Sequence, residues 1–396
     1  MSLKERDRRW TRTREFLKKQ GIECLVVAGL TSREQYDAYL TNDYAEGIVV
    51  FPTEGTPTYI TWMEGRVTRQ KEAEQRGIKP WVADMRVGVD GPTLASVIRE
   101  KGFGKARVGV VGLQTKGPAE MSGFIPYTLW ANTLAELPQV EFVECSEAFA
   151  ALMLVKSEEE LVLMRRSAAV GEEACKVMLE RVRPGVSELE LTAEIMYTIF
   201  KAGAFSPPPF VILHSGPTTV SWGPPIWRYQ GGTTRTFQKG DMVLAEIFPR
   251  YGGFESQQQM AIALRPVDEI HTECARIARH CYEVGLEALR PGVTFQEVVD
   301  AMEVVIKEAG CWHITPLIHS LSPLAWVGRV EASKAGEQGK GAWKSVDLPI
   351  EAGMVFELEP NAHRGNHRVN IGGTVVVTKS GAEELNHLPT RMQIAD

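Results

Sequence analysis

The sequence has little that would tie the protein to a membrane, to nucleic acid or to a disulfide framework. No apolar run in the 396 residues approaches the roughly 20 residues that cross a bilayer, and the charged start of the chain is unlike a signal peptide. The formal net charge of −6 offers no basic surface for nucleic acid. The six cysteines are scattered, without C-x-x-C spacing, and indicate reduced thiols. We therefore expect a cytoplasmic protein that binds neither membranes nor nucleic acid.

The chain does contain enough apolar sequence for two ordinary domains. Its 44% hydrophobic and 24% charged residues are typical of a soluble globular protein. Residues 1–150 predict an α/β domain that begins with a helix at 9–20. Near residue 150 the pattern changes to long amphipathic helices, so we expect a second domain at 151–396. The strands expected in the first domain are 24–28, 47–51, 58–61, 107–111 and 141–145.

A repeated phrase organises the second domain. Residues 183–186 read Arg-Pro-Gly-Val, and residues 290–293, 107 positions later, read the same. At the same offset, Lys-Ala-Gly at 201–203 meets Glu-Ala-Gly at 308–310. An alternative is that Arg-Pro-Gly merely ends a helix twice, since Pro and Gly are common helix terminators. The matching flanks favour a duplicated unit whose two halves surround one cleft.

The two halves predict the same helices and strands twice. Ser157 and Ser187 are helix N-caps followed by acidic first-turn residues. In each half an apolar strand runs into a glutamate, Glu246 and Glu359, and we expect both to point into the cleft. Helices outside a curved, largely antiparallel sheet make an α+β fold. The expected helices are 157–182, 187–202, 267–289 and 294–309, and the expected strands are 209–214, 241–248, 253–263, 353–359 and 369–377.

Five phrases carry a family resemblance. They are Leu-His-Ser-Gly at 213–216, Lys-Gly-Asp-Met-Val-Leu-Ala-Glu at 239–246, Tyr-Gly-Gly-Phe-Glu-Ser at 251–256, Met-Val-Phe-Glu-Leu-Glu-Pro at 354–360 and Thr-Val-Val-Val-Thr at 374–378. In order and spacing they resemble the "pita-bread" superfamily of Xaa-Pro peptidases, methionine aminopeptidases and creatinase. The resemblance implies a C-terminal pita-bread domain with an internal pseudo-two-fold repeat, behind an N-terminal α/β creatinase-like domain. It also implies a homodimer in which the N-terminal domain closes the partner's active site.

The metal ligands of the superfamily's peptidases are only partly present. By resemblance, their two aspartates fall on Glu246 and Gln257, their histidine on His319, and their two glutamates on Glu359 and Gly372. The second aspartate and the last glutamate are the bridging ligands, so the chain lacks both bridging anions. We therefore predict no bound metal and no other cofactor. A mononuclear site on the three remaining ligands stays open, because three protein ligands suffice for a catalytic zinc.

Creatinase is similar here in keeping the fold without metal. It has a glutamate and an upstream histidine at the positions that correspond to Gln259 and Gly223. Because nothing charged stands at 259 to pair with a guanidinium, creatine itself is disfavoured as a substrate. The resemblance implies creatinase-like chemistry only in outline.

Strand parity suggests a carboxylate that could act in place of a metal. Side chains at i, i+2 and i+4 line one face of a strand, so Glu255 is expected on the same face as Gln257 and Gln259. The hypothesis is that Glu255 acts as nucleophile or base, with His319 transferring protons and Glu359 orienting His319 or the substrate. Glu255 could equally be a solvated residue at the rim.

Amides and aromatic rings supply the predicted substrate contacts. Gln257 and Gln259 suit a neutral polar substrate, and Trp222, Trp326 and His214 are candidates for stacking or polar contact. By resemblance, Trp326 stands where the peptidases have a further histidine. The alternative for each ring is ordinary packing. His363 and His367 flank a turn after Pro360 and are expected at the surface.

The favoured function is a hydrolase that cleaves a C–N bond of a small non-peptide amide, amidine or cyclic compound, without metal. One alternative is an Xaa-Pro dipeptidase with a degenerate metal site. Another is a non-catalytic binding module of the same fold. The acidic charge balance does not discriminate among them.

Overall fold

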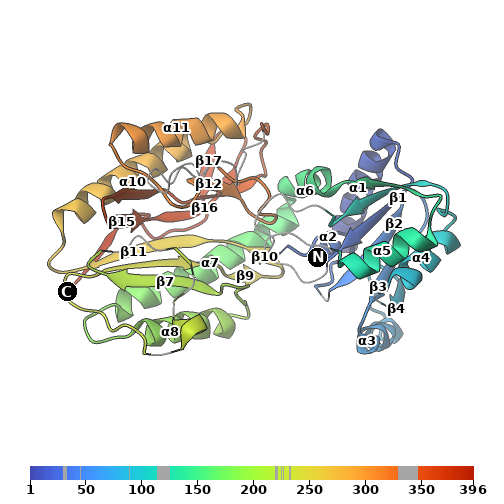
Figure 1. Cartoon of the computed structure of the whole chain (residues 1–396), viewed down its shortest axis with the longest axis horizontal. Coiled ribbons are helices and arrows are strands. Elements are labelled where there is room, and N and C mark those ends of the chain that lie inside the picture. The colour runs from blue at the N-terminus through green and yellow to red at the C-terminus, as the bar shows by residue number, and fades with distance from the viewer. Residues whose placement is uncertain are drawn as a thin grey trace. The chain divides into compact units, whose positions relative to one another are not determined.

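The computed structural model describes residues 1–29, 34–44, 46–88, 90–113, 125–218, 222–223, 225, 227–231, 233–328 and 347–396. The chain divides into two compact units, Met1–Met153 and Leu154–Asp396 (Figure 1). The sequence prediction put the boundary between residues 150 and 151. No helix among the described residues is long and apolar enough to cross a membrane.

The first unit is a mixed sheet with helices. Its sheet has the order β4-β3-β2-β1-β5-β6, in which β1 pairs antiparallel with β2 and parallel with β5. All five predicted strands are present, and β4 was not predicted. The elements are α1 (Leu3–Gln20), β1 (Cys24–Ala28), α2 (Asp37–Thr41), β2 (Gly47–Pro52), β3 (Thr58–Thr61), α3 (Glu64–Gln75), β4 (Asp84–Val87), α4 (Gly91–Glu100), β5 (Arg107–Val111), α5 (Tyr127–Glu136), β6 (Glu141–Glu144) and α6 (Ser146–Leu154).

The second unit is built on a sheet of order β12-β13-β16-β11-β8-β7, whose neighbouring strands are all antiparallel. Two shorter strands extend it, β17 beside β16 and β18 beside β11. The elements are α7 (Glu158–Arg181), α8 (Glu188–Lys201), β7 (Val211–Gly216), α9 (Trp227–Gln230), β8 (Met242–Ile247), β9 (Arg250–Tyr251), β10 (Phe254–Glu255), β11 (Gln258–Leu264), α10 (Glu269–Ala288), α11 (Phe295–Glu308), β12 (Ile318–Ser320), β13 (Val355–Leu358), β14 (Asn361–Arg364), β15 (His367–Asn370), β16 (Gly372–Val377), β17 (Ala382–Glu384) and β18 (Gln393–Ala395).

The predicted repeat is present in the backbone hydrogen bonds. Helices α8 and α11 both have 14 residues and begin with a capping box, on Ser187 and Thr294. The glycine of each Arg-Pro-Gly phrase has positive φ, 94° at Gly185 and 93° at Gly292. These two glycines donate to Phe237 O and Ile350 O respectively. Equivalent bonds at the start of each half show that the phrase marks a duplicated structural unit, beyond a shared way of ending a helix.

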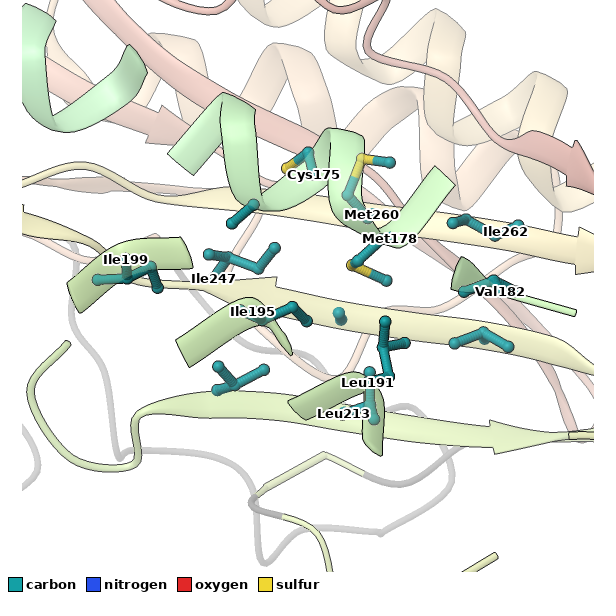
Figure 2. Packing of buried hydrophobic residues seen from close by; sticks show 14 of the residues in the cluster. Cys175, Met178, Val182, Leu191, Ile195, Ile199, Leu213, Ile247, Met260 and Ile262 are labelled. Carbon is teal, nitrogen blue, oxygen red and sulfur yellow. The ribbon is translucent and has the colours of Figure 1, made fainter. Parts of the chain in front are cut away.

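One layer of the second unit's core lies between the first helix pair and the sheet. Figure 2 shows side chains of α7 and α8 packed against those of β7, β8 and β11. The residues shown there include Cys175, Met178, Val182, Leu191, Ile195, Ile199, Leu213, Ile247, Met260 and Ile262. Because apolar side chains alternate along these strands, the residues between them point to the opposite face of the sheet. Glu246 and Gln259 are two of those residues.

Candidate active site

Two rows of polar residues cross the sheet of the second unit. In the first row, Gln259 of β11 lies opposite Glu246 of β8 and opposite Gly372 of β16. In the second row, Glu357 of β13 lies opposite His319 of β12 and opposite Thr374 of β16. Directly opposed residues in neighbouring strands share one face. With their neighbours they form what we call the polar cluster: Glu246, Gln257, Gln259, His319, Glu357, Glu359, Arg368 and Asn370, all buried.

Glu359 is held by two amides in this cluster. Its Oε2 accepts from Gln259 Nε2 at 2.8 Å and from Gln257 Nε2 at 3.4 Å. The prediction that these two glutamines face the same side is therefore confirmed. Burial, followed by the charge of Glu246, raises the pKa of Glu359 well above its usual range, and Arg368 and the Gln259 bond oppose the rise. Burial and the neighbouring acid therefore both favour the neutral form of this carboxyl group.

The space beside Gly372 is occupied by Gln259. A Cβ added at Gly372 would lie 2.1 Å from Gln259 Oε1 and 2.5 Å from the backbone oxygen of Leu358. Both distances are far below van der Waals contact. By the resemblance, Gly372 stands where the superfamily's peptidases have their last glutamate, and Gln259 and Leu358 leave no room for a side chain there.

Glu246 is surrounded by donors. Its Oε1 accepts from Asn370 Nδ2 at 3.0 Å and lies 3.5 Å from Arg368 Nη2. Its Oε2 accepts from Trp222 Nε1 at 3.3 Å. Donors and a guanidinium stabilise the ionised form of a carboxyl group. Asn370, Arg368 and Trp222 thus all present donor groups to the carboxyl oxygens of Glu246.

His319 is oriented by the backbone. Its Nδ1 lies 3.0 Å from Ser320 O. Because a carbonyl oxygen can only accept, Nδ1 carries the proton in the neutral ring and Nε2 is left with its lone pair. Nε2 lies 3.6 Å from Glu359 Oε1, too far for a direct hydrogen bond. His319 Nε2 and Glu359 Oε1 could therefore contact one reacting atom from two sides.

Glu357 is a second buried acid, which the sequence analysis missed. Burial and then the charge of Glu359 raise its pKa well above the usual range, against the hydrogen bond from Thr374. Thr374 Oγ1 donates to its Oε2 at 3.1 Å, while Oε1 has no hydrogen-bond partner among the described residues. Its position two residues before Glu359 on one strand was a signal that could have found it.

Glu255 has a cationic neighbour. Its Oε2 accepts from Arg250 Nη2 at 2.9 Å, and both side chains are buried. The predicted strand at 253–263 is interrupted at Ser256 and Gln257, so parity does not carry from β11 back to β10. Its charge is one of the influences that raise the pKa of Glu357, after burial and the charges of Glu359 and Glu246. Its role as nucleophile or base stays a prediction.

The residues predicted to contact the substrate differ in how exposed their side chains are. Trp222 is exposed, although its ring nitrogen reaches Glu246. His214 Nε2 lies 2.5 Å from the backbone oxygen of Gly223. By the resemblance, Gly223 stands where creatinase has its upstream histidine. The imidazole of His214 therefore lies beside that position, although residue 223 itself is a glycine. Burial, together with the charge of Arg368, lowers the pKa of His214. Trp326 is buried, and its Nε1 has no hydrogen-bond partner among the described residues.

The prediction that His363 lies at the surface is wrong. Residues 365–366 do form a turn, but His363 belongs to β14, is fully buried, and lies opposite Arg368 of β15. Its ring packs against Trp312 with centroids 4.0 Å apart. Burial, and then the charges of Arg368 and His313, lower the pKa of His363 to about 2. It is a neutral imidazole, packed because the hairpin folds inward onto the sheet.

Arg368 and Asn370 were also missed by the sequence analysis. Both lie on β15, and with Gly372 they follow the two-residue period of an extended chain. That spacing was the signal that could have found them. Charged residues are mostly exposed in folded proteins, and for this reason Arg368 was not predicted to lie in the buried site.

The donor set does not suit a pair of divalent metals. Among the described ranges, which omit residues 329–346, no three His, Cys, Asp or Glu side chains are placed to hold an ion. Glu246 and His319 belong to different rows, and a guanidinium already contacts Glu246. The amides of Gln257 and Gln259 turn their NH₂ groups toward Glu359. An NH₂ group repels a cation, so the residues present do not fit the superfamily's metals.

Two proteins are similar in sequence to this chain along almost its whole length. Creatinase of Bacillus sp. (strain B-0618) is 22% identical over 404 aligned positions, covering 98% of this chain and 92% of that protein. Probable dipeptidase PepE of Mycobacterium tuberculosis is 26% identical over 374 positions, covering 92% and 91%.

Solved structures show the same fold. Dipeptidase PepE of Mycobacterium ulcerans has a TM-score of 0.76 at 22% identity, covering 100% of this chain and 99% of its own. The prolidase of Pyrococcus horikoshii OT3 has a TM-score of 0.74 at 17% identity, covering 96% and 98%. At these identities the likeness concerns the fold alone.

A sequence model of one family covers more than half of the chain, from residue 162 to residue 379. Together with the creatinase and dipeptidase relatives, it confirms the predicted superfamily and the predicted class of enzyme, a hydrolase acting on C–N bonds. The chain belongs to metallopeptidase family M24.

Proposed function

We propose that the protein hydrolyses a C–N bond of a small non-peptide amide, amidine or cyclic compound, as a creatinase-like enzyme that works without metal. The observation that carries this proposal is the replacement of both bridging anions. Gln257 is neutral, and Gly372 has neither a side chain nor room for one. Bridging anions allow two dications to lie about 3.5–4 Å apart. Without them the mutual repulsion of the two ions is uncompensated.

Proton transfer then falls to side chains. His319 is suited to accept a proton at Nε2, because its Nδ1 hydrogen is committed to Ser320 O. Glu359 is suited to donate one to the leaving nitrogen, because burial and the charge of Glu246 raise its pKa and favour the protonated form. A positioned acid or base contributes roughly 10²–10⁴-fold to a rate. The two groups lie 3.6 Å apart, which is within ion-pair distance once the imidazole takes up a proton.

The attacking group is either water or Glu255. Glu255 is buried and ion-paired with Arg250, so attack by its carboxylate would require that pair to open. Water activated by His319 needs no such rearrangement. We therefore favour water, and the role of Glu255 is a separate test.

The expected substrate is neutral and polar at the reacting end. Gln257 and Gln259 supply amide groups, and no carboxylate stands at 259 to bind a guanidinium. Trp222 and His214, both partly exposed, are proposed to contact the remainder of the substrate, and Trp326 to pack beside it. Screening small amides, amidines and cyclic imines with protein purified without added ions tests the proposal. Hydrolysis that survives chelation supports it, and hydrolysis abolished by chelation refutes the metal-free part.

The PepE relatives favour one alternative, an Xaa-Pro dipeptidase with a degenerate metal site. Probable dipeptidase PepE is more similar in sequence than creatinase, at 26% against 22% identity. Stoichiometric Mn, Zn, Co or Fe in the purified protein, with cleavage of Xaa-Pro dipeptides, would establish this alternative. Absence of any turnover, with tight binding of an intact peptide, would establish a binding module instead.

A homodimer in which the N-terminal unit closes the partner's site, and a cytoplasmic location, remain proposals. Both come from the sequence and the superfamily resemblance. Sedimentation of the purified protein tests the first, and fractionation of the source cells tests the second.

A further inference from the structure

One arginine lies inside the polar cluster. Arg368 is 1% exposed, among the largest fully buried side chains of the described chain. Its Nη2 lies 3.5 Å from Glu246 Oε1, and its charge is also felt at Glu359 and His214. Strand β15 directs it there, since it lies opposite the buried His363.

Neither the arginine nor its acidic neighbours would be stable in this place alone. A buried guanidinium needs nearby anions, because its loss of hydration is otherwise uncompensated. Buried carboxylates that share one site likewise repel each other unless a cation lies between them or one takes a proton. Here Glu246, Glu357 and Glu359 lie together, and the cation within reach is a guanidinium.

We propose that Arg368 is the resident cation of this site: its guanidinium compensates Glu246 where the family's peptidases hold divalent metal, and it keeps such metal out. This inference rests on the metal-free part of the proposed function. By the resemblance, Glu246 corresponds to a metal ligand of those peptidases. In this protein the positive charge beside the same carboxylate is the guanidinium of Arg368, which is part of the chain itself.

The arrangement has chemical consequences. A dication entering beside Glu246 would meet a fixed positive charge only a few ångströms away, in a site of low dielectric. Unlike an exchangeable ion, the guanidinium is planar and presents donors in fixed directions. Burial lowers the pKa of Arg368, and the charges of Glu246 and Glu359 oppose that shift. The guanidinium is part of the chain, so chelators cannot remove it.

The test uses the full-length protein and removes the guanidinium. Arg368→Ala leaves a space and an uncompensated Glu246, so this variant is expected to bind added ethylguanidinium or MnCl₂, seen as a concentration-dependent rise in Tm and as heat in titration calorimetry. The wild-type protein is expected to respond to neither probe. The double variant E246Q/R368A, in which the anion is also neutralised, is the matched control and is expected to respond to neither.

Folding itself supplies a second measurement. Arg368→Met is expected to lower Tm by several degrees, and adding Glu246→Gln is expected to recover a large part of the loss. If Arg368→Ala does not fold, restoration of a folded protein by Glu246→Gln would support the proposal, and failure to restore it would overturn it. A folded Arg368→Ala that binds neither cation, or a double variant that binds as well as the single, would also overturn it.

These outcomes are independent of the substrate screen. If no C–N compound is hydrolysed and Arg368→Ala still gains cation binding, the proposed function is refuted and the role of Arg368 is supported. If hydrolysis is found and Arg368→Ala gains no cation binding, the proposed function is supported and the role of Arg368 is refuted.

Discussion

Replacing Gly372 by alanine tests the steric part of the proposal that the site excludes metal. The added Cβ would lie 2.1 Å from Gln259 Oε1 and 2.5 Å from Leu358 O. The amide of Gln259 can move, although it must then give up its 2.8 Å hydrogen bond to Glu359. The carbonyl of Leu358 belongs to β13, which pairs with β16, so it can move only with the sheet. Overpacking of this kind costs about 1–3 kcal/mol.

The neighbouring glycine provides a matched control. A Cβ at Gly373 points to the other face of β16 and would meet Tyr282 Oη at 3.4 Å and Asn386 at 3.5 Å, which are ordinary contacts. Both glycines lie on the same strand, so loss of glycine's backbone freedom affects them alike. Urea unfolding should place Gly372→Ala below Gly373→Ala by about 1–3 kcal/mol. Equal stability would show that Gln259 does not fill the space, and the steric part of the case against metal would be lost.

Three further changes test the catalytic assignments and one buried acid. His319→Asn should leave Tm near that of the wild type and lower kcat by roughly 10²–10⁴-fold; wild-type turnover would refute its role as base. Glu255→Gln removes the carboxylate that accepts from Arg250 and should cost about 3–5 kcal/mol; turnover per folded molecule that is unchanged would exclude Glu255 as nucleophile. Burial raises the pKa of Asp37 to about 8, so the folded state keeps a proton that the unfolded state loses above its ordinary pKa. Stability should therefore fall by up to about 1.4 kcal/mol per pH unit between roughly pH 4 and 8, and Asp37→Asn should flatten that slope in Tm measurements.

Much of the fold could be predicted because its signals are local. The capping boxes at Ser187 and Thr294 and the paired Arg-Pro-Gly phrases act within a few residues of chain, and the structure reproduces them as equivalent helices. The inward hairpin β14–β15 was not predicted in this way. Within residues 361–370 the two-residue spacing of Arg368 and Asn370 is a weak signal, and the burial of His363 and Arg368 comes from packing against α10 and the sheet.

The site divides along the same line. Strand parity predicted that Glu255, Gln257 and Gln259 face one side, and the amides of Gln257 and Gln259 both donate to Glu359. The strand is interrupted at Ser256 and Gln257, so parity alone does not place Glu255, which pairs with Arg250. To predict the buried place of Arg368, one must know which acidic residues surround it. That information is spread over β8, β13 and β15. A buried charge is defined by its neighbours, and no local pattern contains them.

The changes in the polar cluster depend on one another. Losing the anions at 257 and 372 makes a pair of dications unstable, and losing the dications leaves Glu246 and Glu359 uncompensated. The arginine at 368 supplies one positive charge, and Gln259 fills the space beside Gly372 while donating to Glu359. Restoring any single ligand would thus be harmful: a carboxylate at 257 adds an anion without a metal, and a side chain at 372 collides with Gln259. A centre that holds two metal ions would require new anions at 257 and 372 and removal of both Arg368 and the Gln259 side chain. Under the proposed metal-free function, the cluster is therefore internally balanced without a metal ion.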